Sequence, residues 1–348
     1  MLRTRRFWLG VAVSLVFIAL FFWKTDIREI ADAFRQANYA IALASLPVFF
    51  LSIWVRTIRW RYLMRPVADV PVRRLYPVAI IGLMANNLIP ARAGELVRAY
   101  VLGERERVSK VASLGTIAVD RLFDGLTLVP VLVVIGTVAG LSQDLRELAI
   151  VMAALFGAAL VILMAAVSWE SGREGLLRLG LRFVPGRLHD QVETMMRSFL
   201  EGLRALRNPL DLGIAWAMSL LSWSLEAAMY YIVGVAFSLR ADFHEYLMVT
   251  AAANLAISVL ATQGGVGPFE FFAQQTLVFF GIEEGRAAAY SIALHALLLV
   301  PVIILGLYLL WAINLSFGEM FRKGVEGREQ GPSQAVDVGA PLAQRTSE

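Results

Sequence analysis

The sequence predicts an all-α polytopic membrane protein with about seven full spans, two short re-entrant or broken helices, and two halves built as pseudo-repeats. The first observation is composition: hydrophobic residues make up 58% of the 348 residues and charged residues only 17%. A soluble chain averages near half apolar and a quarter charged, so this chain has too much apolar surface to be soluble. The second is that the apolar residues come in long blocks, and the third is a pair of similar breaks between such blocks.

Seven blocks approach or exceed the length of about 20 residues that a helix needs to cross a bilayer. They are residues 7–23, 39–55, 122–141, 148–169, 212–237, 246–261 and 287–317. The first follows three arginines and resembles a signal peptide. We predict a retained helix instead, because the polar Lys24-Thr25-Asp26 follows it and a small-residue cleavage site does not.

The distribution of basic residues predicts the orientation, because loops rich in Lys and Arg stay in the cytoplasm. Twenty-five basic residues fall in residues 1–6, 56–74, 91–111, 170–210 and the tail after 317, against six in the remaining loops. This bias predicts a multi-pass protein of a bacterial or archaeal cytoplasmic membrane with both termini in the cytoplasm.

Two further apolar blocks, 75–89 and 266–280, are short and rich in Gly, Asn, Pro or Ala. Block 75–89 lies between two strongly basic segments, so a full crossing would put one of them outside. A re-entrant half-helix removes this conflict, provided protein or a water-filled cavity covers it. Block 266–280 is expected to return outward after 246–261 as a tilted or broken helix.

The chain divides into a cytoplasmic N-terminus (1–6), a transmembrane domain (7–317) and a disordered cytoplasmic tail (318–348). Within the domain, 170–210 is the largest soluble part. Apolar residues recur there at i, i+3 or i+4 with Arg and Glu between them, which predicts an amphipathic helix on the inner leaflet. These residues are Val192, Met195, Met196, Phe199, Leu203 and Leu206.

The first break carries candidate binding residues in the string NNLIPARAGELVR, residues 86–98. Pro90 stops one helix and lets another begin, and free N–H groups at a helix start bind anions. Arg92 has a planar guanidinium suited to phosphate. Glu95 lies one helical turn from both Arg92 and Arg98 and can pair with either. A purely structural interpretation, in which these charges fix a helix at the interface, remains open.

The second break, TQGGVGPFE at 262–270, repeats this chemistry with a sharp turn, a helix start and an acidic residue. Gly265 and Gly267 allow a sharp turn and close approach of a ligand, and Glu270 lies just inside the new helix. Asn87-Leu88 and Asn254-Leu255 precede the two breaks, which suggests two similar halves with a site at their interface. The alternative is a tight membrane turn with an interfacial glutamate.

Two more groups place charge in or near apolar segments. Asp120, Arg121 and Asp124 can share one helix face, and we favour a structural Arg121–Asp124 salt bridge while leaving Asp120 open. Glu226 is in the middle of a predicted span and should be protonated or paired, so it is a structural or coupling residue.

Several chemistries find no support in the sequence. Cysteine is absent, and the three histidines, His189, His244 and His295, are far apart, so we predict neither a metal site nor a cofactor. His295 is expected to be a packing residue on an apolar helix. There is no P-loop pattern and no recognisable catalytic domain, and the net charge of +4 is explained by membrane orientation rather than by nucleic-acid binding.

These groups resemble the lysylphosphatidylglycerol synthase transmembrane (flippase-like) family. The resemblance covers about residues 8–318, in the order Arg59-Trp60, NNLIPARAGELVR (86–98), DRLFDGL (120–126) and GGVGPFE (264–270). It implies a membrane domain with re-entrant segments that moves lipids between leaflets, with Arg92, Glu95, Gly265, Gly267 and Glu270 at motif positions. The chain departs from the family at Thr262-Gln263, where Ser-Pro is usual, and it lacks the synthase domain, so aminoacyl transfer is not expected.

We therefore predict a lipid translocase for an anionic, aminoacylated or lipid-linked headgroup, with homo-oligomers left open. Its expected substrate-binding residues are Asn87, Pro90, Arg92, Glu95, Arg98, Gly265, Gly267 and Glu270. One alternative is a membrane-embedded transferase acting on a lipid-linked sugar, which would need Asp120 and Asp124 for a metal. The other is an accessory protein that binds a partner through 170–210 and transports nothing.

Overall fold

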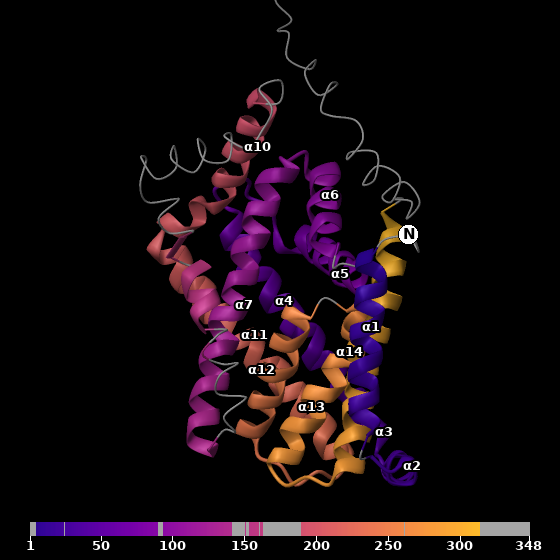
Figure 1. Ribbon diagram of the computed structural model, residues 1–348. Coiled ribbons are helices and arrows are strands. Elements are labelled where there is room, and N and C mark those ends of the chain that lie inside the picture. Colours follow the sequence, from indigo (N-terminus) through magenta and orange to yellow (C-terminus); the bar gives the residue numbers. More distant parts are fainter. Residues whose placement is uncertain are drawn as a thin grey trace, which may run out of the picture.

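The structure, a computed structural model, describes residues 5–23, 25–89, 93–140, 150, 153–159, 161–162, 189–260 and 262–313. Within these ranges the secondary structure is helical and contains no strand (Figure 1). The helices are α1 Arg5–Phe22, α2 Ile27–Gln36, α3 Tyr39–Ala44, α4 Leu46–Met64, α5 Val72–Leu88, α6 Gly94–Glu106, α7 Lys110–Ala139, α10 His189–Gly202, α11 Pro209–Ala236, α12 Phe243–Val259, α13 Pro268–Phe279 and α14 Glu284–Ala312. Short 3₁₀ turns, η3 and η4, cover Leu203–Arg207 and Gln263–Gly265.

Four helical segments of the described chain are long and apolar enough to cross a membrane. They are Tyr39–Met64 (α3 with α4), Lys110–Ala139, Pro209–Ala236 and Glu284–Ala312. A fifth candidate is the bent pair Gly10–Phe22 and Ile27–Gln36, whose axes differ by 83°. The protein is therefore an all-helical multi-pass membrane protein, and the predicted block 148–169 lies largely outside the described residues.

The second span is longer than the sequence predicted. We expected it to stop at residue 55, but α4 continues to Met64 and includes Arg56 and Arg59. The reason is that Arg56 and Arg59 have buried partners, so these charges do not end the apolar helix. Residues 56–64 are consequently part of the helical bundle and not of a loop.

The first break separates α5 from α6, which pack against each other as a hairpin. The Asn86 side chain accepts a hydrogen bond from the Gly94 backbone N–H at 2.8 Å and so ties the two helix ends together. A side chain at Gly94 would collide with the Gly82 carbonyl oxygen, which shows how closely the two helices approach. Arg74 and Glu106, at the far ends of the hairpin, form an ion pair of 2.8 Å. The hairpin is the arrangement that a re-entrant segment requires, and its insertion into the membrane as a half-helix stays a prediction.

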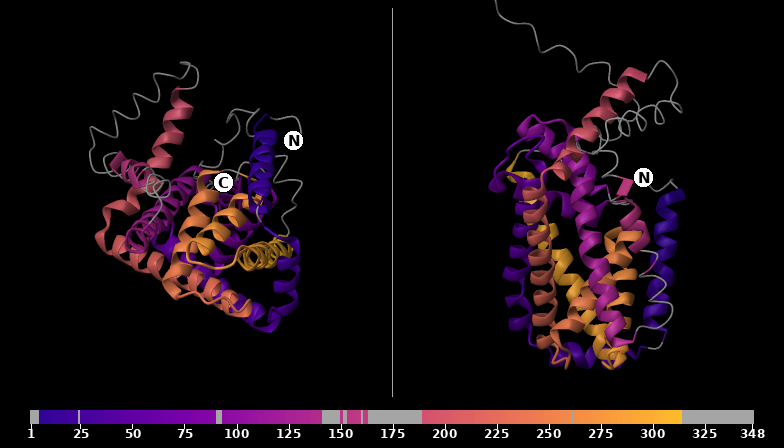
Figure 2. Two further views of the ribbon diagram at one scale, coloured as in Figure 1. Left: turned by 60° about the horizontal axis from the view of Figure 1, so that its bottom comes forward. Right: turned by 90° about the vertical axis from the view of Figure 1, so that its left-hand side faces the viewer.

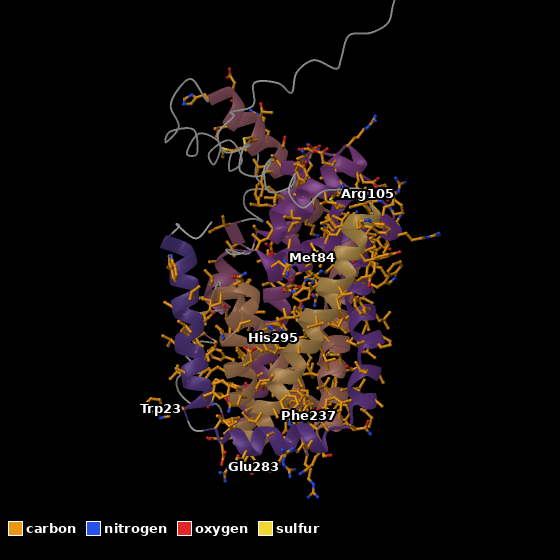
Figure 3. All side chains as sticks on the ribbon, turned by 90° about the vertical axis from the view of Figure 1, so that its right-hand side faces the viewer. Trp23, Met84, Arg105, Phe237, Glu283 and His295 are labelled. Atoms are coloured by element: carbon orange, nitrogen blue, oxygen red, sulfur yellow. The ribbon has the colours of Figure 1, made fainter. Side chains whose placement is uncertain are left out.

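The second break separates α12 from α13 and differs from the sequence-based expectation. We expected 246–261 to cross completely, whereas α12 has 17 residues, or about 25 Å at 1.5 Å per residue, against a core of about 30 Å. The tip of this hairpin is bonded to His295, which lies midway along the bundle between Arg105 and Glu283 in Figure 3. Helices α12 and α13 thus form a second hairpin that enters from the end of the bundle opposite to the first.

Helix packing follows the same order in the two halves. A long helix is followed by a hairpin and then by another long helix: α4, α5–α6, α7 in one half and α11, α12–α13, α14 in the other. Helix α4 packs along α11, α5 packs on α14, and α12 packs on α7 (Figure 1). Each hairpin therefore lies against a long helix of the other half.

Helix α10 is the described part of the predicted amphipathic segment, and it projects beyond the bundle (Figure 2). The turn η3 that follows α10 is packed into the bundle, because Leu203 and Leu206 are buried against Val119 and Phe123 of α7. The predictions for residues 170–188, for the tail 318–348 and for residues 1–4 lie outside the described residues.

Candidate functional site

A fully buried arginine, Arg59 of α4, organises the interior of the bundle. Its Nε donates to Oδ1 of Asp120 at 2.9 Å and its Nη2 to Oδ1 of Asp124 at 2.8 Å. Its Nη1 donates to the Ser219 hydroxyl of α11 at 2.8 Å. The guanidinium thereby joins three helices, as its planar set of donors allows.

Asp120 accepts from a second arginine on its other oxygen. Arg98 Nη1 donates to Oδ2 of Asp120 at 3.0 Å, and the Arg98 guanidinium lies 3.5 Å from the centre of the Trp60 ring. Asp120 has no solvent exposure, and its charge is compensated by close ion pairs with Arg59 and Arg98. Burial of these charges is tolerated only because each has a close partner.

Two further ion pairs extend this network toward the first break. Arg121 pairs with Asp124 at 3.1 Å and lies 3.6 Å from Glu95 at the start of α6. On the other side, Arg56 pairs with Glu226 at 2.8 Å. We call the whole set the ion-pair cluster; in the described chain it comprises Arg56, Arg59, Arg98 and Arg121 with Glu95, Asp120, Asp124 and Glu226.

A cavity lies beside the ion-pair cluster, between α4, the first hairpin and α7. Its volume, with the open mouth included, is about 360 Å³. Its lining contains three arginines, one carboxylate, and small, neutral polar and apolar residues. The lining residues are Ile53, Arg56, Thr57, Ala79, Gly82, Leu83, Asn86, Gly94, Glu95, Arg98 and Arg121. The charged part of this wall is therefore predominantly cationic.

The three arginines of the wall share a feature that Arg61, outside the cavity, also has. The Nε atoms of Arg56, Arg98 and Arg121 are buried and have no hydrogen-bond acceptor within the described chain. A buried N–H without an acceptor costs free energy, and an anion with several oxygens would supply acceptors. The Glu95 side chain, 27% exposed and hydrogen-bonded to Asn86 at 3.1 Å, is the carboxylate of this wall.

The second break has its own polar group. Glycines 264, 265 and 267 have φ of 62°, 78° and 96°, in the region that favours glycine, so the turn depends on them. Glu270 accepts from the Gly267 N–H at 2.8 Å and caps α13. His295 of α14 lies with Nδ1 2.6 Å from Glu270 Oε1 and with Nε2 3.0 Å from the Gly264 carbonyl oxygen.

The tips of the two hairpins touch. The Gln263 side chain donates to the Leu88 carbonyl oxygen at 3.0 Å, and Gly264 lies against the Asn87 backbone. The two segments selected from the sequence, although about 175 residues apart, thus meet midway along the bundle, through a hydrogen bond between two exposed residues.

The predicted site residues fall into two groups in the structure. Glu95, Arg98, Asp120, Arg121, Asp124 and Glu226 belong to the ion-pair cluster, whereas Asn87, Gly265, Gly267 and Glu270 lie at the hairpin tips. Pro90 and Arg92 lie outside the described residues. The predicted Arg121–Asp124 salt bridge is present. Glu226 was expected to be either protonated or paired, and it is paired with Arg56.

Two residues have partners that the sequence did not predict. Glu95 contacts Asn86 and Arg121. Of its two predicted partners, Arg98 points instead to Asp120, and Arg92 lies outside the described residues. His295 is more than a packing residue, since both of its ring nitrogens have polar partners. The sequence analysis missed Arg56, Asn86 and Ser219, and it named Arg59 only within a family motif. The i, i+3 spacing of Arg56 and Arg59 next to an apolar helix was the signal that could have identified these two arginines.

Comparison with known proteins points to the same class of membrane protein. The chain is 27% identical over 303 residues to a UPF0104 membrane protein of Methanothermobacter thermautotrophicus, covering 81% of this chain and 88% of that protein. A second UPF0104 membrane protein of that organism is 26% identical over 309 residues, 83% of this chain and 87% of that protein. Glycosyltransferase AglD of Haloferax volcanii is 24% identical over 354 residues, which cover 92% of this chain but only 56% of that protein.

The family match covers most of the chain and includes both hairpins and the ion-pair cluster. Residues 7–306 match the family described as the lysylphosphatidylglycerol synthase TM region. This range agrees with the resemblance carried by the motifs around residues 59, 86–98, 120–126 and 264–270. The chain belongs to the lysylphosphatidylglycerol synthase TM region family.

Proposed function

We propose that the protein moves a lipid with a phosphate-bearing headgroup between the two leaflets of the membrane. The observation that carries this proposal is the cavity beside the first hairpin, where Arg56, Arg98 and Arg121 each have a buried Nε–H without a hydrogen-bond acceptor in the described chain. For Arg121, the Glu95 carboxylate lies 3.6 Å from this atom and forms an ion pair with it. A phosphate offers several oxygens to donors in this arrangement, and arginine is well suited to bind it.

The charge balance of the cavity limits the class of headgroup. Most carboxylates of the ion-pair cluster are occupied by close arginines, whereas Glu95 is 3.6 Å from Arg121 and partly exposed. A headgroup that combines a phosphate with a hydroxyl or amino group has a donor for Glu95 as well as acceptors for the arginines. An apolar lipid without a polar headgroup has neither.

The arrangement of the hairpins supports movement rather than simple binding. We interpret the two halves as an inverted repeat, because the order of long helix, hairpin and long helix recurs and the hairpins enter from opposite ends. Transporters built from inverted repeats place their sites near the middle of the membrane, at the interface of the halves and next to broken helices. The cavity and the hairpin tips fit this pattern, with the expected cytoplasmic side at the end where α1 begins and α14 ends (Figure 1).

A lipid-linked sugar is one candidate cargo, since the name of the related AglD of Haloferax volcanii denotes a glycosyltransferase. We favour movement of such a lipid over sugar transfer by this chain. Metal-dependent transferases need free carboxylates, and both Asp120 and Asp124 bind Arg59. The transferase interpretation predicts metal-dependent activity that Asp120→Asn abolishes.

The decisive experiment is a leaflet assay with purified protein in liposomes. Fluorescent phosphatidylglycerol, its aminoacyl form, a polyprenyl phosphate and a phosphate-free glycolipid are compared, and a membrane-impermeant quencher reports how fast each changes leaflet. We expect movement of at least one phosphate-bearing lipid and none of the phosphate-free glycolipid.

Arg121→Gln tests the site, and Arg61→Gln is its matched control. The two arginine side chains are 37% and 36% exposed, yet only Arg121 lines the cavity. Loss of a hydrogen bond between charged groups costs about 1.5–3 kcal/mol, so Arg121→Gln should slow movement about tenfold to 100-fold. The proposal would be refuted if the phosphate-free glycolipid changed leaflet as fast as the phosphate-bearing lipids. It would also be refuted if Arg121→Gln moved lipid at the wild-type rate.

A further inference from the structure

The pair formed by Glu270 and His295 lies apart from the ion-pair cluster and holds the tip of the second hairpin. His295 Nδ1 is 2.6 Å from Glu270 Oε1, and Nε2 is 3.0 Å from the Gly264 carbonyl oxygen. The other Glu270 oxygen accepts from the Gly267 N–H. The imidazole ring stacks on Phe269, with ring centres 4.4 Å apart, so its orientation is fixed by packing.

The two contacts of His295, with Glu270 Oε1 and with the Gly264 carbonyl oxygen, require a definite number of protons. A carbonyl oxygen only accepts, so His295 Nε2 must carry a hydrogen to bond Gly264. A proton is then also needed between Nδ1 and Glu270 Oε1, either on the imidazolium or on the carboxylic acid. Both contacts therefore form only when the pair holds two protons, one of them shared between histidine and glutamate.

Loss of the shared proton breaks one of the two contacts. A neutral imidazole carries one hydrogen, and a glutamate carboxylate carries none. With the hydrogen on Nε2, the lone pair of Nδ1 faces the carboxylate; with the hydrogen on Nδ1, the lone pair of Nε2 faces the Gly264 carbonyl oxygen. Either Glu270 or the hairpin tip must then move away from His295.

With the shared proton the pair is neutral, and its surroundings in the described chain offer no nearby cation to balance the negative charge that proton loss would leave. In the described chain, the charged residues of α1, α5, α12 and α14 are confined to their ends: Arg5, Arg6, Arg73, Arg74, Glu245, Glu284 and Arg286. Toward α11, the ring of Tyr230 faces Phe269, and Glu226 is paired with Arg56. The remaining ionisable groups on these helices are His244 and tyrosines, of which Tyr290 bonds the Tyr230 carbonyl oxygen.

We infer that Glu270 and His295 form a proton-binding site in which one shared proton holds the tip of the second hairpin against α14. Loss of this proton to water leaves neutral histidine and glutamate carboxylate and releases the tip. Because Gln263 at this tip binds the Leu88 carbonyl oxygen, release also weakens the contact with the first hairpin. The inference concerns the hairpin alone and does not rest on the proposed movement of lipid.

Single-cysteine labelling tests this inference, since the natural chain has no cysteine. Thr262, next to the tip, is 4% exposed, so Thr262→Cys reacts with a maleimide only when the tip is released. Release of one proton predicts a labelling rate that rises about tenfold per pH unit through the transition. Val138→Cys, at a site that is 87% exposed, corrects for ionisation of the thiol itself.

Two variants make the result specific. Thr250→Cys, in α12 and 1% exposed, is a buried control that should stay protected at every pH. Combining Thr262→Cys with Glu270→Gln should give slow labelling independent of pH, because the glutamine amide donates to Nδ1 with a hydrogen that cannot leave. Labelling of Thr262→Cys that does not change between pH 5 and 10, or the same pH dependence with Glu270→Gln, would overturn the inference.

A second measurement needs no change at Glu270. The protein has three histidines, so ¹⁵N-labelled imidazoles give few signals, and His295→Asn identifies those of His295. We expect both His295 nitrogens to sense a bound proton at low pH and one proton to be lost as pH rises. A single neutral tautomer at every pH would refute the shared proton whatever the labelling shows.

Discussion

At the scale of single residues, Asp120 makes the strongest prediction for stability. It accepts from Arg59 and Arg98 and has no solvent exposure. Asp120→Asn leaves the buried Arg98 without its carboxylate partner and Arg59 with Asp124 alone, and breaking a buried ion pair costs about 3–5 kcal/mol. We expect a corresponding loss of the free energy of unfolding in detergent, measured by thermal denaturation.

The matched control for Asp120 is Asp69→Asn, which removes the partner of Arg61 in an exposed pair of 3.2 Å. Exposed pairs contribute about 0–1 kcal/mol, so this variant should unfold near the wild-type temperature. Equal stability of Asp120→Asn and Asp69→Asn would mean that the network around Arg59 is not what holds α4, α6 and α7 together.

The same residues show how far the sequence could predict the site. Glu226 and the Asp120–Asp124 segment were identified because charges inside apolar blocks are costly and therefore need partners. Their partners, Arg56 and Arg59, were assigned to a basic loop because the apolar block seemed to stop at residue 55. The pairing of α4 with α7 and α11 is a long-range contact, and local spacing carries no information about it.

At the scale of helices, the close packing of the first hairpin depends on Gly94. A Cβ atom there would collide with the Gly82 carbonyl oxygen and with the Asn86 side chain. Gly94→Ala should therefore destabilise the protein by about 1–3 kcal/mol, the usual cost of overpacking. Gly213→Ala in α11 meets no neighbouring atom and should be neutral or stabilising by up to about 1 kcal/mol. Thermal unfolding of the two variants compares them directly, and a neutral Gly94→Ala would contradict the tight packing of α5 on α6.

The second hairpin shows why element depth is harder to predict than element type. The sequence identified the helices before and after the glycine-rich break, and the structure has them as α12 and α13. Hydropathy cannot distinguish a short helix that stops halfway from one that crosses, because both are apolar along their whole length. Only the contact between Gly264 and His295 places the break midway along α14.

At the scale of the whole molecule, the two breaks meet midway along the bundle. Each was selected from the sequence for the same features, a reversal of the chain and a glutamate at the start of the next helix. In the structure, each glutamate contacts a side chain of the following long helix: Glu95 lies near Arg121 of α7, and Glu270 bonds His295 of α14. The tips then meet through Gln263 and Leu88, so the two hairpins are in direct contact.

This contact gives a prediction for the mechanism of lipid movement. If the hairpin tips must separate for a headgroup to pass, joining them should stop movement. Leu88→Cys with Gln263→Cys introduces the only two thiols in the chain, at residues that touch in the structure. A short, reducible cross-linker should lower movement in the liposome assay to the rate of empty vesicles, and reductant should restore it.

Arg74→Cys with Glu106→Cys is the matched control, because it joins α5 and α6 within one hairpin and leaves the tips free. Undiminished movement with the tips cross-linked would show that the headgroup passes without separating them, through the cavity beside α4 alone.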